Sequence, residues 1–161
     1  MIAAVVLTIL LVGQAAAERE QSLQGAFDSV IQSVASGWSL FGAQVRETDS
    51  VYKWRANPDD NDVVVLIVRR FVNHLDAAAE LQGTAKLLSV GPIRVDGLGD
   101  GAFVGSVPGG PQNYYIRVEN ILVQLHVPRS IKEHRRIAER MVQVLRDTPD
   151  DGARARQRSA R

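Results

Sequence analysis

The sequence predicts a two-layer α+β fold, in which a mostly antiparallel β-sheet is covered by helices, with an N-terminal signal segment before it. Apolar residues recur at helical spacing in three stretches, 18–36, 73–88 and 130–146. Segments rich in β-branched or alternating apolar residues lie at 43–70 and 102–127, bounded by turn residues. Each half of the chain therefore runs from a strand pair to a helix, which is typical of a two-layer α+β domain.

Composition limits the classes of function. The chain has 161 residues, enough for one domain with a hydrophobic core, and its 45% hydrophobic content is that of a globular protein. The body from Glu18 to Asp151 carries 15 basic and 18 acidic residues, so it lacks the clustered positive charge that nucleic-acid binding needs. Cysteine is absent, which excludes disulfides, thiolate metal sites, a cysteine nucleophile and a lipid-modified cysteine.

The N-terminus has the features of a secretory signal peptide. A nearly unbroken apolar run over 2–12 is followed by three alanines that end at Ala17. We expect cleavage between Ala17 and Glu18 and export to the periplasm or the cell exterior. The alternative is an uncleaved membrane anchor, although the apolar run is shorter than the roughly 20 residues of a membrane-spanning helix. Contact with a membrane is expected only if Met1–Ala17 is retained.

The segment 18–36 is predicted to be an amphipathic helix, which either packs on the domain or leads away from it as a stalk. Its apolar residues fall on one helical face, and Ser36-Gly37 is a natural end. The residues of this face are Leu23, Phe27, Val30, Ile31 and Val34.

The next part, 38–70, is predicted to contain three strands of an α+β domain that spans 38–147. A polar turn at 47–50 separates the first two strands. The sequence NPDDND at 57–62 predicts a surface turn, because Asn and Asp side chains bond to their own backbone. Its clustered carboxylates also suit calcium, but their spacing differs from that of an EF-hand loop. The β-branched run 63–68 predicts a strand buried on both faces.

A helix over 73–88 should follow, since Asn73 and Asp76 have the spacing of a capping box. The glycine-rich loop at 97–101 resembles a phosphate-binding loop, but such a loop precedes a helix. Here a strand-like segment follows it at 102–107. We therefore interpret it as a tight turn in which Asp100 caps backbone amides.

The last part of the domain should be a β-hairpin and a helix. Strands at 113–118 and 121–127 flank a two-residue turn, Glu119-Asn120, in which Asn suits a positive φ. Ser130 and Glu133 have the spacing of a second capping box before the final helix. Residues 148–161 form a basic tail with four arginines, which we expect to be disordered and solvated.

The turn Gly97–Phe103 (GLGDGAF), followed by a hairpin and a capped helix, resembles a broad set of small exported bacterial α+β domains. Many of these are domains of unknown function, and some are similar in fold to the photosystem PsbP and Mog1 proteins. The resemblance covers about residues 40–146. It implies a non-enzymatic accessory or binding domain of the cell envelope and transfers no residue-level function. The chain lacks the lipobox cysteine that many such proteins carry.

The first functional hypothesis is an interaction or ligand-binding domain without a cofactor, whose partner is an unknown protein or small ligand of the cell envelope. The contact residues predicted from the loop and the following strand are Asp96, Asp100, Tyr114 and Tyr115. Tyrosines on an exposed sheet face are frequent contact anchors, although one of two adjacent tyrosines must face the core.

A metal-dependent enzyme is the second hypothesis. His126 ends a strand and His134 lies near the start of the next helix, with Glu119 or Glu133 as a third ligand. No serine has the context of a nucleophile elbow, and the carboxylates of 57–62 lie on a predicted exposed turn. A membrane-anchored structural domain is a third hypothesis, which applies if the signal segment stays attached.

Overall fold

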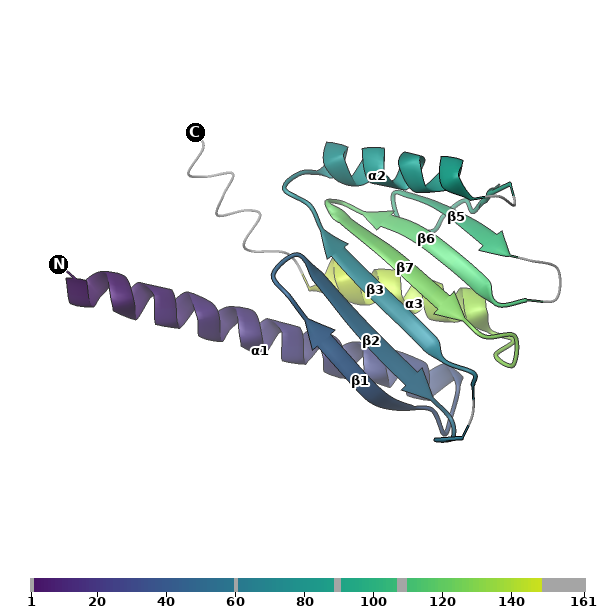
Figure 1. The fold of residues 1–161 in the computed structure, drawn as a ribbon, viewed down its shortest axis with the longest axis horizontal. Helices are drawn as coiled ribbons and strands as arrows, with labels where there is room; N and C mark the ends of the chain where they lie inside the picture. Colours follow the sequence, from purple (N-terminus) through teal and green to yellow (C-terminus); the bar gives the residue numbers. More distant parts are fainter. Residues whose placement is uncertain (1, 60, 89–90, 107–109, 149–161) are drawn as a thin grey trace.

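The computed structural model describes residues 2–59, 61–88, 91–106 and 110–148, with side chains from Ala17 onward except that of Ser106. Its helices are α1 (Ile2–Val34), α2 (His74–Leu87) and α3 (His134–Asp147) (Figure 1). Its strands are β1 (Ser39–Val45), β2 (Asp49–Arg55), β3 (Val64–Arg70), β4 (Ile93–Arg94), β5 (Gly101–Ser106), β6 (Gln112–Val118) and β7 (Ile121–Val127). Met1 of the predicted signal segment and 149–161 of the predicted tail lie outside the described residues.

Within the described residues, the strands form one antiparallel sheet of seven strands in the order β1-β2-β3-β7-β6-β5-β4. The chain makes the β1–β2–β3 meander and then crosses through α2 to the far edge. It returns through β5 and β6, so that β7 pairs with β3 at the centre. The predicted α+β class, with an antiparallel sheet covered by helices, is confirmed. The predicted two-layer arrangement is wrong, because helices lie on both faces of the sheet.

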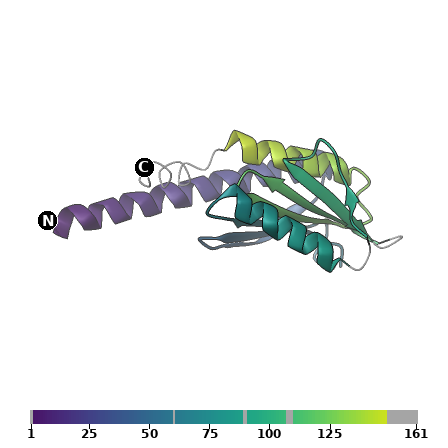
Figure 2. The ribbon, with the colours of Figure 1, turned by 90° about the horizontal axis from the view of Figure 1, so that it is seen from above.

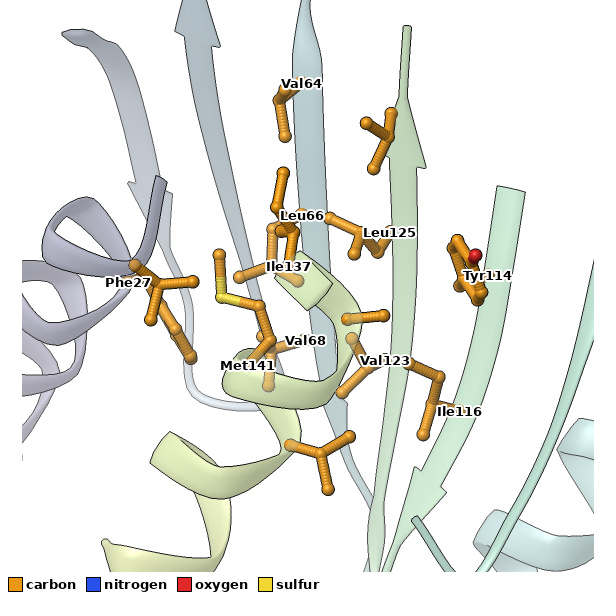
Figure 3. Packing of buried hydrophobic residues seen from close by; sticks show 14 of the residues in the cluster. Phe27, Val64, Leu66, Val68, Tyr114, Ile116, Val123, Leu125, Ile137 and Met141 are labelled. Carbon is orange, nitrogen blue, oxygen red and sulfur yellow. The ribbon is translucent and has the colours of Figure 1, made fainter. Parts of the chain in front are cut away.

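The first face of the sheet is covered by α1 and α3, which pack against each other (Figure 2). The main core lies between these helices and the sheet. Figure 3 shows Phe27 of α1 and Met141 of α3 in one cluster with Leu66 of β3 and Val123 of β7. Burial of each such side chain stabilises the fold by about 1.5–3 kcal/mol. The residues that α1 buries are Leu23, Phe27, Val30 and Ile31, all from the face that the sequence pattern predicts.

The second face carries α2 on the side of β5, β6 and β7 (Figure 2). Leu81 of α2, Phe103 of β5 and Leu122 of β7 form a small second core there. Among the described residues, no helix covers β1, β2 and β3 on this face. The prediction that the run 63–68 is buried on both faces is therefore wrong for the second face, where Val65 and Ile67 are only half-buried.

The two predicted capping boxes have different outcomes. At α2, Asn73 Oδ1 accepts hydrogen bonds from the backbone N–H groups of Leu75 at 2.9 Å and Asp76 at 3.0 Å, as expected. The predicted box of Ser130 and Glu133 is wrong, because α3 begins at His134 and its N-cap residue Glu133 makes no side-chain capping bond. The residues between β7 and α3 form a turn instead.

In the β6–β7 turn, the positive φ belongs to Glu119 (φ 53°) and not to Asn120 as predicted. Asn120 is buried, and its Nδ2 donates to the carbonyl oxygen of Phe71 at 2.9 Å. The backbone N–H of Phe71 donates in return to the carbonyl oxygen of Asn120 at 2.9 Å. The side chain of Asn120 therefore ties the hairpin to the segment just before α2, and Glu119 takes the left-handed conformation.

The glycine-rich loop provides a matched pair of substitutions. Gly97 and Gly99 both have positive φ, 75° and 63°. A Cβ on Gly97 would meet nothing within 4 Å, whereas a Cβ on Gly99 would lie 2.4 Å from the carbonyl oxygen of Arg117. We expect Gly97→Ala to lower the free energy of unfolding by about 1 kcal/mol, because the only cost is that alanine disfavours a positive φ. Gly99→Ala should lower it by about 2–3 kcal/mol, because the loop must also move off β6. Denaturant titration of both variants measures the difference, and equal losses would contradict the close approach.

Candidate functional site

The most distinctive surface is the part of the second face that α2 leaves uncovered, which we call the open half-face. It consists of the second-face side chains of β1, β2 and β3 together with Gln124 and His126 of β7. Its central row is set by strand register, which places Gln44, Val51, Ile67 and Gln124 side by side. Val51 and Ile67 are half-buried aliphatic side chains, and in this row they lie between the polar side chains of Gln44 and Gln124.

A shallow hollow of about 550 Å³ lies on this surface beside the start of α2. Val51, Ile67 and Gln124 line it together with Arg69 and Phe71. Arg69 closes the side toward α2, since its Nη1 lies 2.6 Å from Glu80 Oε1 of that helix. The Arg69 guanidinium also lies 5.7 Å from the centre of the Phe71 ring. The ion pair of Arg69 and Glu80 thus bounds the hollow on the side of α2.

At its other end the open half-face is more polar. Register places Lys53, Val65, His126 and Asn113 in one row. His126 Nδ1 lies 2.8 Å from Asn113 Oδ1, and burial lowers the pKa of this histidine. Burial therefore disfavours the charged imidazolium, and the contact with Asn113 occupies the Nδ1 side of the ring.

The residues predicted as contacts in the loop serve different purposes. Asp96 is exposed and lies 3.3 Å from the Nε of Arg94. Asp100 joins three elements: its Oδ2 accepts the backbone N–H of Glu119 at 2.5 Å, and its Oδ1 lies 3.3 Å from Nη2 of Arg146 in α3. Asp100 therefore caps a backbone amide, as the sequence predicts, and it connects the loop to the hairpin and α3.

Tyr114 and Tyr115 point to opposite faces of β6, so they do not form one site. Tyr114 is buried under α3, and its hydroxyl lies 2.6 Å from His134 Nδ1. Tyr115 stacks on Phe103 with ring centroids 5.0 Å apart, beside α2. Neither ring lies on the open half-face, because α3 and α2 cover this part of the sheet on its two sides.

His126 and His134 are also not brought together. His126 lies on the second face, whereas His134 contacts Tyr114 on the first face, with the sheet between them. Burial lowers the pKa of His134 as well. Within the described residues, no three His, Cys, Asp or Glu side chains are grouped so that they could hold a metal ion.

The predicted Asx-rich turn at 57–62 has the expected local hydrogen bonding in its described part. The backbone N–H of Asp59 donates to Asn57 Oδ1 at 3.4 Å, and Arg55 Nη1 donates to the carbonyl oxygen of Pro58 at 3.1 Å. Asp60 lies outside the described residues. The turn is therefore held by hydrogen bonds between side chains and backbone groups of its own segment.

A buried polar cluster of Glu20, Arg70, Ser50 and Tyr52 was not predicted from the sequence. Arg70 forms an ion pair with Glu20 of α1, and Tyr52 Oη donates to the same carboxylate at 2.9 Å. Burial, followed by the charge of Glu20, raises the pKa of Tyr52 to about 12, so this hydroxyl keeps its proton at neutral pH. The cluster attaches α1 to β2 and β3, and the side chains of its ion pair are only 12% and 17% exposed, so we interpret it as structural.

Comparison with known proteins gives no match: no family model, no curated protein and no solved structure is similar to this chain. In the part of the chain that the structure describes, no helix has both the length and the apolar character needed to cross a membrane.

Proposed function

We propose that this chain is an exported, non-catalytic domain of the cell envelope that binds a protein partner through the open half-face. The observation that carries the proposal is the unequal covering of the sheet. Two helices cover its first face, and α2 covers β5–β7 on the second (Figure 2). An apolar centre inside a polar rim is the arrangement found in protein contact surfaces.

The chemistry of the surface agrees with binding rather than catalysis. His126, Arg69 and Arg55 each contact a neighbouring group of the chain itself, which positions them as parts of a fixed surface. Val51 and Ile67 supply the apolar centre that a partner would bury. Export is proposed from the N-terminal segment, whose apolar run and alanines are those of a signal peptide.

Site-specific photo-crosslinking in the host cell tests the binding surface. A photoreactive residue at Ile67 should yield a discrete crosslinked protein, whereas one at Gln32, exposed on α1 at the first face, should not. In the Gln124 photoreactive variant, Ile67→Glu should reduce the yield at least tenfold, because it places a charge in the apolar centre. Identical crosslinking patterns from Ile67 and Gln32 would contradict the proposal.

The intact mass of the chain recovered from the host tests export separately. We expect a mature form that begins at Glu18. A chain that retains Met1–Ala17 would contradict cleavage at the predicted position, while the crosslinking result would still decide the binding surface.

A further inference from the structure

The two edges of the sheet are built differently. β4 is a two-residue strand, Ile93–Arg94, and it carries a charge at Arg94. β1 at the opposite edge has seven residues, SLFGAQV, without a charged residue or a proline. Among the described residues β1 pairs only with β2, so its outer backbone N–H and C=O groups face no other strand (Figure 1). An edge of this kind is a template for pairing with another chain.

One feature of β1 hinders pairing with another chain: its register with β2 shifts between Leu40 and Gly42. Beyond it, Gly42 to Val45 pair in regular register with β2, so this part of the edge stays straight enough to accept a neighbour. Phe41 and Val45 are 44% and 46% exposed on the same strand. The edge therefore offers apolar side chains in addition to backbone hydrogen-bonding groups.

We propose that a second copy of this chain pairs antiparallel with β1 about a two-fold axis, which makes one continuous sheet through both chains. In a two-fold antiparallel contact the residue on the axis faces its own copy, so a charge on or next to the axis would lie close to a like charge. The uncharged β1 avoids this repulsion, whereas Arg94 would not in a pair of β4 strands. Such a contact also closes at two copies and leaves β1 fully paired.

The pairing has a consequence for the surface described above. An axis perpendicular to the sheet keeps equivalent faces on the same side. The two open half-faces would then join across β1 and its copy into one surface. This inference does not depend on the proposed function, because it concerns the edge and not the face.

Because the chain contains no cysteine, single cysteines report the pairing directly. We would place one at Gly42, Ala43 or Gln44 of the full chain, which covers two-fold axes at the first three residues of the regularly paired part of β1. A Cβ at Gly42 would meet only Lys53 Cβ, at 3.9 Å, so this variant should fold. Residues opposite each other in adjacent strands have Cα atoms within disulfide range. At least one variant should form a covalent dimer ten or more times faster than Lys132→Cys, an exposed control in the turn before α3.

Sedimentation velocity on charge variants completes the test. Gln44→Lys on exposed β1 should weaken self-association at least tenfold, whereas Ile93→Lys at the β4 edge should leave it unchanged. Crosslinking at β1 no faster than at Lys132 would overturn the proposal. A dimer that is insensitive to Gln44→Lys would overturn it as well, since it would assign association to another surface, such as the apolar residues before Ala17.

Discussion

Replacing Arg70 by Met should lower the free energy of unfolding by roughly 3–5 kcal/mol, the range for removing one partner of a buried ion pair. The side chains of Arg70 and Glu20 are only 12% and 17% exposed. Arg70 Nη1 also donates to Ser50 Oγ at 3.2 Å. The variant leaves the Glu20 carboxylate buried with two hydroxyl donors, Ser50 and Tyr52, and without its cation.

The adjacent residue is a control of the same type. Arg69 pairs with Glu80, but these side chains are 40% and 39% exposed, so Arg69→Met should cost at most about 1 kcal/mol. The double variant Glu20→Leu/Arg70→Met should recover much of the loss, because it removes both charges. Urea titration of the full chain measures all three. Equal losses for Arg69→Met and Arg70→Met would show that the cluster is not shielded from water.

Local features of this fold follow from sequence patterns. The helical spacing of Leu23, Phe27 and Ile31 predicts a buried face, and the structure buries all three. Asn73 predicts the start of α2, because an Asn side chain satisfies amides at a helix N-terminus. These predictions depend on residues within one or two turns of each other.

The candidate site depends on long-range placement and could not be predicted in this way. The run 63–68 has the same β-branched composition on both sides of the strand, so nothing in it shows which side a helix covers. That is decided by α2, which lies over β5–β7 because the crossover carries the chain to the far edge. Likewise, Glu20 and Arg70 are 50 residues apart, and either alone is typical of a surface residue.

The packing of α1 leads to the second large expected effect. Phe27→Ala should lower the free energy of unfolding by about 3–5 kcal/mol, through lost burial and the cavity that remains. Phe27 is fully buried and contacts Tyr52 edge to face, with ring centroids 5.5 Å apart. On the same helix, Gln32→Ala at an exposed position should change stability by less than about 0.5 kcal/mol. Urea titration measures these changes.

The same titration on a chain that begins at Glu18 tests whether α1 still packs on the sheet after the predicted cleavage. Among the α1 side chains that the structure describes, from Ala17 onward, those that are buried lie at Leu23 or beyond, and the Glu20 carboxylate also remains. We therefore expect this chain to unfold with the free energy of the full chain, and Phe27→Ala to cost the same in both. If Phe27→Ala cost less than about 1 kcal/mol in either chain, α1 would be a stalk and not part of the core. In that case the first face would be open as well, and the unequal covering that supports the binding surface would no longer distinguish the second face.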